Sequence, residues 1–379
     1  MTHDQMTALQ PRIGVRTIAT ALLSGSAPAA RLPTRRRART AVLVFALAVV
    51  GLHALAVFIL DVAWTRFRDP EYGRRATSLR ERVAEYPDRP LVLVVGSSRV
   101  SMGVRPDVWE ERRPGTPHDP MLFNMSLVGS GPVMQLLTLR RSLADGFRPT
   151  VVLLEYWPPL LCDGGAQNEH DRIDVRRLRW DDRAVVRGYF PDPSETERQM
   201  LAARRNIFQS HRTLLMLQLT PDLLHRTAQQ SGRGIEPDGW GWLAGMEPRD
   251  DEERQRLTDH VRPTVRGWMN GRTIHPTADR ALRESVALAR EHGAAVGFVY
   301  MPESTGSQRW YSPELEATAR VHLRGLSDEL SVPVIDARDW VADHDLADGM
   351  HLSRTGAGVF SARLGPAVVA TFPTIGGKP

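Results

Sequence analysis

Residues 91–99, LVLVVGSSR, are the most informative stretch of this 379-residue chain. The first five form an unbroken apolar run between Pro90 and Gly96, which is typical of a strand buried on both faces of a parallel sheet. A serine on the turn that follows, Ser98 or its neighbour Ser97, would lie at the carboxyl edge of that sheet, where open α/β folds place their active sites. A plain turn without a catalytic role is the alternative.

A second motif near the C-terminus could complete such a site. Asp348 and His351 stand three residues apart in the sequence DGMH, close enough for the carboxylate to orient the imidazole. A serine, a histidine base and an orienting carboxylate are the parts of an activated-hydroxyl nucleophile. Taken alone, Asp-x-x-His is also compatible with a solvated or capping pair. The joint occurrence of both motifs favours a catalytic set of His351, Asp348 and one of the two serines, Ser98 or Ser97.

The segments between these motifs alternate between strand and helix patterns. We predict helices over 132–144, 278–292, 313–330 and from about 355, and strands over 91–95, 121–125, 150–155, 295–301 and 332–336. This alternation predicts a three-layer α/β domain with a parallel sheet, spanning residues 91–379.

The alternation breaks between about residues 160 and 275. We interpret this region as a mainly helical insertion, or lid, over the carboxyl edge of the sheet, with a second independent domain as the alternative. Its Trp240 and Trp242 are candidates for stacking on sugar rings. Packing in a small core of the insertion's own is the alternative for both.

An apolar segment precedes the α/β pattern. Residues 41–60, AVLVFALAVVGLHALAVFIL, carry no formal charge, and a helix of this length would span about 30 Å, the thickness of a bilayer's hydrocarbon core. Five arginines between residues 31 and 39 place the N-terminal side in the cytoplasm. We therefore predict a disordered cytoplasmic tail over 1–40, one transmembrane helix over 41–60, and a juxtamembrane connection over 61–90.

This topology predicts a single-pass protein of the cell membrane whose larger part is extracytoplasmic, either periplasmic or extracellular. Two other interpretations of the apolar segment stay open. It could be a cleaved signal peptide, which would release a secreted lipase. It could also be the buried core helix of a soluble fold.

The composition argues against several classes of function. The net charge is +5, but basic residues are scattered among acidic ones after residue 70, so we expect no nucleic-acid binding. The single cysteine, Cys162, excludes an intrachain disulfide and a cysteine-rich metal site. There is no Gly-rich phosphate loop, no His-Glu-x-x-His motif and no cluster of His and Cys. We expect neither a metal nor a cofactor.

Acyl transfer through Ser98 would need donors for a developing oxyanion, and each donor is typically worth about 10²–10³ in rate. The backbone amides of Ser98 and Gly129 are the candidates, and the side-chain amide of Asn124 is a third. The alternative for Gly129 is a simple turn glycine, and the alternative for Asn124 is an asparagine that caps a turn.

Three further residues are weaker candidates for substrate binding. Arg99, beside the serine, would anchor an anionic substrate or cover the surface. Glu303, after the strand at 295–301, would bind a substrate hydroxyl or pair with Arg309. Trp157 follows the strand at 150–155 and is a candidate for contact with substrate.

With these residues in place, the chain resembles the SGNH/GDSL hydrolase superfamily. More narrowly, it is similar to the membrane-anchored bacterial SGNH-like proteins of cell-surface polysaccharide O-acetylation or D-alanylation. Gly96-Ser97-Ser98 stands where the family has its Gly-Asp-Ser block, which puts the nucleophile on Ser98 rather than Ser97. The segment 124–129 is similar to the second block, and 348–351 to the final Asp-x-x-His block. The resemblance implies a flavodoxin-like, three-layer SGNH fold.

The sequence departs from this family in one block. A Gly-x-Asn-Asp loop should follow the strand at 150–155, but the chain has Tyr156-Trp157-Pro158-Pro159 there. The first block also has Ser97 in place of the usual aspartate. A catalytically degenerate scaffold or glycan-binding protein, acting in an envelope polysaccharide-modification complex, is therefore the alternative to an enzyme.

The resemblance and the residues together predict a serine esterase or O-acyltransferase with a Ser-His-Asp triad. Its substrate would be a cell-envelope glycan or a small acyl ester. A membrane-bound protein that delivers the acyl group is a candidate partner.

Overall fold

The computed structural model describes residues 35–63, 68–113, 119–223, 236–270 and 273–373. The predicted cytoplasmic tail lies outside these ranges up to residue 34. Its last residues, 35–40, are helical and not disordered, because the arginines there are good helix formers and continue into the apolar segment. The chain divides into two compact units, Met1–Leu55 and Ala56–Pro379.

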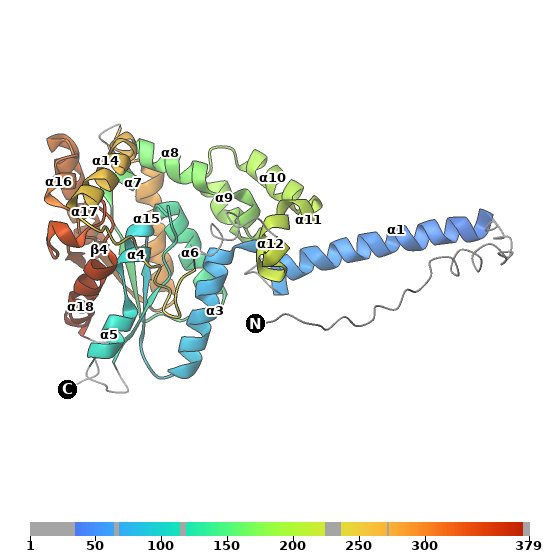
Figure 1. The fold of residues 1–379 in the computed structure, drawn as a ribbon, viewed down its shortest axis with the longest axis horizontal. Helices are drawn as coiled ribbons and strands as arrows, with labels where there is room; N and C mark the ends of the chain where they lie inside the picture. The colour runs from blue at the N-terminus through green and yellow to red at the C-terminus, as the bar shows by residue number, and fades with distance from the viewer. Residues whose placement is uncertain (1–34, 64–67, 114–118, 224–235, 271–272, 374–379) are drawn as a thin grey trace, which may run out of the picture. The chain divides into compact units, whose positions relative to one another are not determined.

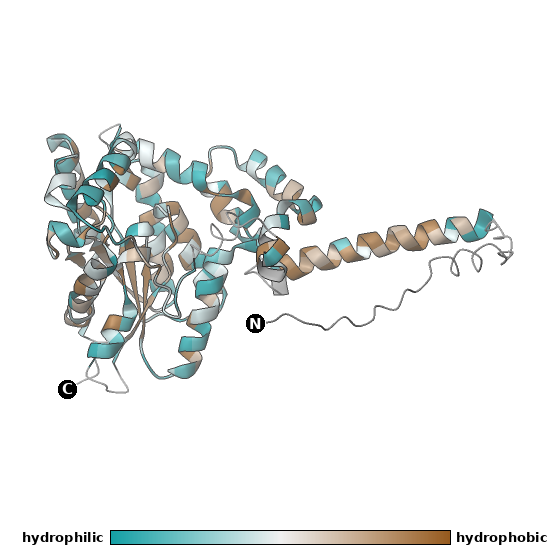
Figure 2. Ribbon diagram, in the orientation of Figure 1, coloured by the Kyte–Doolittle hydropathy of each residue, from teal (hydrophilic) through white to brown (hydrophobic). Residues whose placement is uncertain are grey.

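The apolar segment forms helix α1 (Arg35–Phe58), followed by a π-helical turn, η1 (Ile59–Ala63). The stretch Arg35–Asp61 is long and apolar enough to cross a membrane, and no residue of α1 is buried. In Figure 2 the ribbon of this helix has the colour of hydrophobic residues along most of its length. The buried-core-helix interpretation is therefore wrong. Which side each end faces, and whether the segment is cleaved, remain predictions.

The second unit contains a five-stranded sheet in the order β2-β1-β3-β4-β5, with every pair parallel (Figure 1). The strands are β1 (Leu91–Val95), β2 (Met121–Asn124), β3 (Val151–Glu155), β4 (Ala295–Tyr300) and β5 (Val334–Asp336). All residues of β1, β2 and β3 are buried, as expected for a parallel sheet covered on both faces. Since the strand order reverses at β1, the crevice for a ligand is expected at the carboxyl ends of β1 and β3.

Helices cover both faces of this sheet and make the predicted three layers. On one face, β1 residues Leu91 and Leu93 share a core with α3 (Pro70–Glu85), α6 (Pro132–Ala144), α15 (Pro276–Glu291) and α17 (Pro313–Leu330). On the other face, Val92 and Val94 pack with α4 (Ser98–Gly103), α5 (Pro106–Arg112) and α18 (Arg354–Thr371). The α/β fold class is therefore confirmed.

Helix α3 belongs to the domain, although the sequence analysis placed it in a juxtamembrane connection. Its Tyr72 and Leu79 are 1% and 0% exposed and join the core beside Leu91. Asp69 caps the helix and pairs with Arg141 of α6 at 2.9 Å. The predicted domain boundary at residue 91 is thus too late, because the amphipathic pattern of α3 has its partner in the sheet and not in a bilayer.

The insertion between β3 and α15 is mainly helical. Its elements are α7 (Pro158–Leu161), α8 (Asp163–Arg172), η2 (Val175–Arg177), η3 (Trp180–Asp182), α9 (Arg183–Tyr189), α10 (Pro193–Arg205), α11 (Ile207–Ser210), α12 (Arg212–Leu219), η4 (Pro221–Leu223) and α14 (Asp251–Trp268). Val186 and Met200 pack against Leu136 and Leu137 of α6 and Ala281 of α15. The insertion therefore shares its core with the α/β domain.

A buried carboxylate also joins the insertion to the sheet layers. Glu169 of α8 is 2% exposed and accepts hydrogen bonds from the first-turn amides of α6, from Met134 at 2.7 Å and Val133 at 3.4 Å. Burial nevertheless raises the pKa of Glu169 to about 7, because these neutral donors replace full hydration only in part.

Leu79→Ala tests the membership of α3 in the core. We expect the free energy of unfolding to fall by about 2–5 kcal/mol, since the substitution removes a fully buried side chain. Glu81→Ala, on the exposed side of the same helix, should change it by less than about 0.5 kcal/mol. The measurement is urea unfolding of the full chain in detergent. If both substitutions change the free energy of unfolding equally, residues 70–85 are a connecting segment and not part of the core.

Glu169→Gln tests the buried carboxylate through pH. In the wild type, a pKa raised above the ordinary 4.5 means that the folded state binds more protons than the unfolded one between pH 4.5 and 7. Stability should therefore decrease as pH rises through that window, by on the order of 3 kcal/mol from this group. The glutamine variant should lose this part of the slope in unfolding curves taken at several pH values. An identical slope in both proteins would contradict the assignment.

Candidate active site

The turn after β1 presents a single serine hydroxyl. Ser97 is 1% exposed, and its Oγ accepts a hydrogen bond from the Arg99 amide at 3.2 Å, so it caps α4. Ser98 is the first residue of α4 and is partly exposed. Only glycine fits at position 96, because a Cβ there would lie 2.5 Å from Cγ2 of Val100 and 2.8 Å from Cβ of Glu155.

The histidine stands on a tight turn near the C-terminus. Oδ1 of Asp348 accepts hydrogen bonds from the amides of Met350 at 3.1 Å and His351 at 2.8 Å. Gly349 has φ 88°, a conformation that side-chain-bearing residues rarely adopt, and its carbonyl accepts a hydrogen bond from the Ser304 amide at 2.9 Å. The turn is therefore fixed both internally and against the loop after β4.

The fold brings Ser98 and His351 together, although they are 253 residues apart in sequence. Oγ of Ser98 lies 2.8 Å from Nε2 of His351. Nδ1 of His351 lies 2.7 Å from Oδ2 of Asp348. A proton on Nδ1, donated to the carboxylate, leaves the Nε2 lone pair facing the serine hydroxyl, which is the arrangement that activates a nucleophile.

The environment of Asp348 favours its charged form. The side chain is fully buried, and burial alone would raise its pKa. The neighbouring imidazole and the two backbone donors outweigh burial and lower the pKa of Asp348 below its ordinary value. The carboxylate is thus ionised at neutral pH and can hold the imidazole in one tautomer.

Asn124 does not serve as an oxyanion donor, contrary to the sequence-based prediction. Its side-chain amide donates to the carbonyls of Val100 at 2.8 Å and Val104 at 2.9 Å, and it lies 3.2 Å from the carbonyl of Ser101. Both hydrogens of the amide are therefore engaged with the last turn of α4. The residue holds the short helix against β2, and the helix in turn carries Ser98.

Gly129 lies on the loop after β2 and has φ 76°. A Cβ at this position would lie 3.0 Å from a guanidinium nitrogen of Arg172. The loop is held by a hydrogen bond from the Val128 amide to Oε1 of Glu71 at 2.7 Å. The role of the Gly129 amide as an oxyanion donor remains a prediction.

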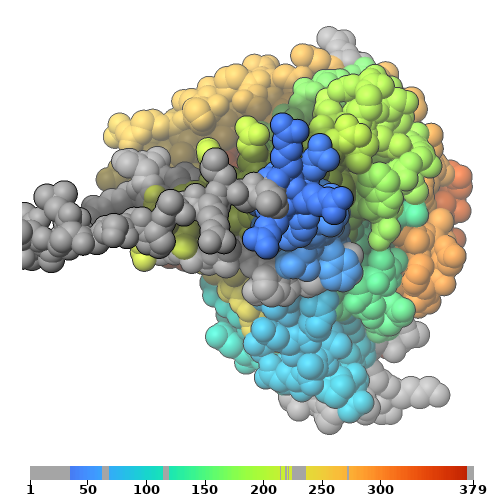
Figure 3. All heavy atoms as spheres, turned by 90° about the vertical axis from the view of Figure 1, so that its right-hand side faces the viewer, coloured from blue at the N-terminus to red at the C-terminus, as the bar shows by residue number. Residues whose placement is uncertain are grey.

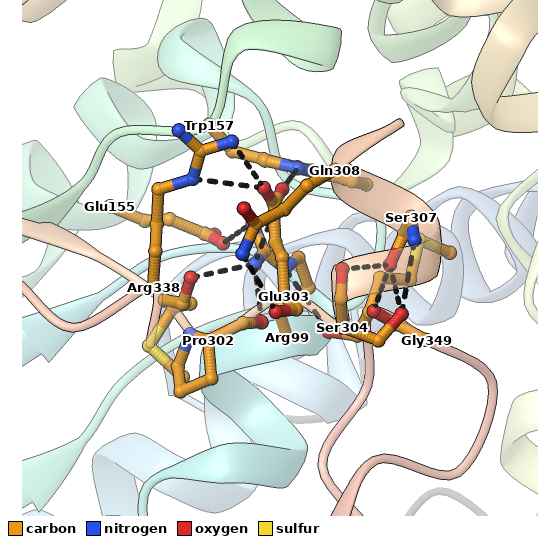
Figure 4. Close-up of polar contacts among 12 residues, drawn as sticks. Arg99, Glu155, Trp157, Pro302, Glu303, Ser304, Ser307, Gln308, Arg338 and Gly349 are labelled. Atoms are coloured by element: carbon orange, nitrogen blue, oxygen red, sulfur yellow. Dashed lines mark hydrogen bonds and ion pairs between the residues drawn. The ribbon is translucent and has the colours of Figure 1, made fainter. Parts of the chain in front are cut away.

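Arg99 neither binds substrate nor covers the surface, so both predicted roles are wrong. It is fully buried, and Nη2 donates to the carbonyls of Met301 at 2.9 Å and Pro302 at 2.8 Å (Figure 4). Nε donates to the carbonyl of Met350 at 3.2 Å, and the guanidinium stacks on the Trp157 ring at 4.6 Å. Arg99 thus ties the serine turn to the loop after β4 and to the histidine turn.

Glu303 and Trp157 are also internal, and not substrate contacts as predicted. Oε1 of Glu303 accepts hydrogen bonds from the Trp157 indole at 2.8 Å and the Tyr311 hydroxyl at 2.6 Å. Its ion-pair partners are Arg338 at 3.2 Å and Arg99 at 3.6 Å, not Arg309. Figure 4 shows Trp157, Arg338 and Arg99 gathered around Glu303, and the burial of this group leaves no room for a substrate hydroxyl.

Glu155, the last residue of β3, belongs to the site and was missed by the sequence analysis. It is 1% exposed, its Oε2 accepts a hydrogen bond from the Ser97 amide at 2.5 Å, and its Oε1 lies 3.8 Å from Nη1 of Arg99. Burial raises the pKa of Glu155 above its ordinary value of 4.5. The sequence does contain a signal for this residue. Glu155 is a single charge at the end of an apolar strand, and the carboxyl end of that strand lies at the same edge of the sheet as the serine turn.

The two insertion tryptophans pack on the α/β domain. The Trp240 carbonyl accepts a hydrogen bond from the backbone amide of Asn124 at 3.1 Å. The Trp242 indole donates to the carbonyl of Met102 at 2.7 Å. The guanidiniums of Arg82 and Arg105 stack on the two rings at 4.9 Å and 4.5 Å. These contacts favour a packing role over sugar stacking, and the core concerned is the domain's and not the insertion's own.

Comparisons with known proteins give distant structural similarity only. No protein-family model matches the sequence, and no curated protein matches it. A Bacteroides fragilis protein described as an acylhydrolase is 11% identical, with a TM-score of 0.36 over 77% of this chain and 96% of the other. A carbohydrate acetylesterase from Sinorhizobium meliloti is 12% identical, with a TM-score of 0.30 over 75% and 100%. These scores are too low to support an inference about this chain.

Glu155→Gln tests whether the carboxylate positions the serine turn. The amide keeps an acceptor for the Ser97 amide but removes the charge that faces Arg99, so the turn should loosen. We expect reaction of Ser98 with a fluorophosphonate to slow on the order of 10- to 100-fold, with the protein still folded.

Asp182→Asn is the matched control, since Asp182 is also a buried carboxylate paired with an arginine, Arg141, but on the insertion. It should lower stability and leave the labelling rate within about twofold. If Glu155→Gln reacts as fast as the wild type, the positioning role is wrong.

Proposed function

We propose that the protein is a membrane-anchored serine esterase or O-acyltransferase of the SGNH type. The observation that supports it is the continuous pair of contacts from Ser98 through His351 to Asp348, at 2.8 and 2.7 Å. These three side chains come from opposite ends of the domain, and the Asp348 carboxylate is dedicated to the imidazole and its own turn.

In this proposal Ser98 Oγ attacks the carbonyl carbon of an ester while His351 Nε2 takes the hydroxyl proton. The tetrahedral intermediate collapses with cleavage of the ester C–O bond, and the imidazolium returns the proton to the leaving alkoxide. Water or an acceptor hydroxyl then attacks the acyl-serine while His351 takes its proton. The bond between the acyl carbon and Ser98 Oγ breaks, and the imidazolium returns the proton to Oγ. Asp348 keeps the imidazole oriented and stabilises its charged form in both halves.

The developing oxyanion needs preorganised donors. The Ser98 amide is suited to this role, because it is the first amide of α4 and needs no partner within the helix. The Gly129 amide is the proposed second donor. Asn124 and Arg99 are excluded as donors by their hydrogen bonds to backbone carbonyls.

The proposed substrate is an acyl ester, most simply an acetyl ester, on a cell-envelope glycan, or a small acyl ester. An extracytoplasmic catalytic unit held by α1 would suit a polymer that cannot diffuse to the enzyme. It would equally suit a membrane-bound partner that supplies the acyl group. The helix length and hydropathy support the anchor.

A non-catalytic scaffold of the same fold is the second candidate. The sequence Tyr156-Trp157-Pro158-Pro159 stands where the family has Gly-x-Asn-Asp, and Trp157 is used internally to hold Glu303. In that case the Ser98–His351 contact would carry no chemistry.

Substitutions in the triad separate these two candidates. In the full chain purified in detergent, Ser98→Ala should abolish turnover of p-nitrophenyl acetate and labelling by a fluorophosphonate. Asp348→Asn should lower the rate by roughly 10⁴, since the wrong imidazole tautomer would then be favoured. Both effects are expected without loss of the fold.

Ser97→Ala is the matched control on the neighbouring hydroxyl. It removes the cap of α4 and should cost about 1 kcal/mol in stability while keeping the labelling. Equal activity of the wild type and Ser98→Ala, or loss of labelling in Ser97→Ala alone, would refute the proposed nucleophile. Comparison of acetylation of envelope glycans in cells with and without the protein would test the substrate.

A further inference from the structure

The insertion contacts the end of the apolar segment through a small hydrophobic cluster. Leu60 is 3% exposed and Ile207 of α11 is 1% exposed, and Ala56, Val57 and Leu215 of α12 pack against them. All these residues belong to the same compact unit. Helices α11 and α12 are thus packed on the last turns of the segment that would cross a bilayer.

An ion pair marks where the apolar segment ends. The Asp61 carboxylate pairs with Arg204 of α10 at 3.0 Å and with Arg68 at 2.6 Å. Arg204 is also held by the carbonyls of Met200 and Leu178, at 3.1 and 3.2 Å. Since charges avoid the hydrocarbon core, Asp61 and Arg204 fix the level of the polar headgroups.

The depth of the cluster follows from helix geometry. Val57 precedes Asp61 by four residues, which is about 6 Å along a helix. The cluster against which Val57 and Leu215 pack therefore lies between the headgroups and the acyl chains if α1 crosses the bilayer.

Helices α10, α11 and α12 and the turn η4 expose further apolar and basic side chains. Leu201 of α10 is 40% exposed, Phe208 of α11 is 51% exposed, and Leu223 at the end of η4 is 73% exposed. Arg205 and Arg212 are exposed beside them. Figure 3 looks onto the face of the molecule where α10 and α11, in yellow-green, form the surface. Apolar residues bordered by arginines are typical of helices that lie in the plane of a bilayer interface.

We propose that this membrane-contact surface, made of Leu201, Arg205, Phe208, Arg212 and Leu223, lies in the interface of the bilayer that α1 crosses. Its partner is the phospholipid surface itself, with the apolar side chains among the upper acyl chains and the arginines on anionic headgroups. Phe208 directly follows Ile207, which shares the cluster with Leu60 of the apolar segment, and this is why we choose a bilayer over a second protein. The inference rests on the proposed crossing of the membrane by α1.

Site-directed fluorescence in vesicles tests this surface. Single cysteines at Phe208→Cys and Leu223→Cys would carry the environment-sensitive dye NBD, in the full chain reconstituted into phosphatidylcholine and phosphatidylglycerol vesicles. The native Cys162 is fully buried and should remain unlabelled. Val321→Cys on α17 is the matched control, because it is 63% exposed and apolar but lies on a helix that covers the sheet. Val50→Cys, within the apolar segment, shows whether α1 crosses the bilayer.

We expect quencher-bearing lipids to reduce the fluorescence at positions 208, 223 and 50 at least threefold more than at position 321. Quenching at 50 with none above the control at 208 and 223 would overturn the proposal. A blue-shifted emission of the dye at position 208 without quenching by lipids would also overturn the proposal, because that result indicates a protein partner. Absence of quenching at 50 would overturn both the crossing and the surface.

The result is independent of the proposed chemistry. The labelled Phe208→Cys protein should give the same quenching when it also carries Ser98→Ala, because the surface uses no residue of the triad. A protein that is quenched as expected but hydrolyses no ester would therefore refute the esterase and leave the membrane-contact surface standing.

Discussion

The buried guanidinium of Arg99 is the contact on which the geometry of the site depends. It follows Ser98 directly in the chain, and it donates to the carbonyls of Met301, Pro302 and Met350. The serine turn, the loop after β4 and the histidine turn therefore meet at one group. A planar cation with donors in a fixed fork suits this task, because it can satisfy several carbonyls at once without moving.

Burying this cation has a cost that the surrounding carboxylates offset. Glu155 lies 3.8 Å from Nη1 and Glu303 3.6 Å from Nη2, and Arg338 also pairs with Glu303. Removing one member would leave an unbalanced charge in a dry environment, which is far more destabilising than never having had the pair. The network thus couples the stability of the domain to the position of the proposed nucleophile.

The insertion has two attachments with different chemistry. Toward the sheet it shares a core with α6 and α15, and Glu169 caps α6. Toward the apolar segment it presents Ile207 of α11 and Leu215 of α12, which share a small hydrophobic cluster with Leu60. If the proposed surface is correct, the region is less a lid than a support that joins the α/β domain to the bilayer. Its tryptophans agree with that view, since Trp240 and Trp242 fasten the returning chain to β2 and α4.

The sequence alone determined the elements whose signals are local. The run at 91–95 became β1, the helices at 132–144 and 313–330 have the predicted bounds, and the apolar segment was evident from hydropathy. Both motifs of the proposed triad were visible too, because each is a short, contiguous pattern.

Only the tertiary structure decided which side chains face the site. Arg99, Asn124 and Glu303 carry groups suited to substrate, yet each is used to tie one loop to another, and Glu155 acts on the serine turn from a neighbouring strand. The physical reason is that a polar side chain at a sheet edge can turn either outward or inward. Which direction it takes depends on partners tens to hundreds of residues away, and no local pattern encodes those partners.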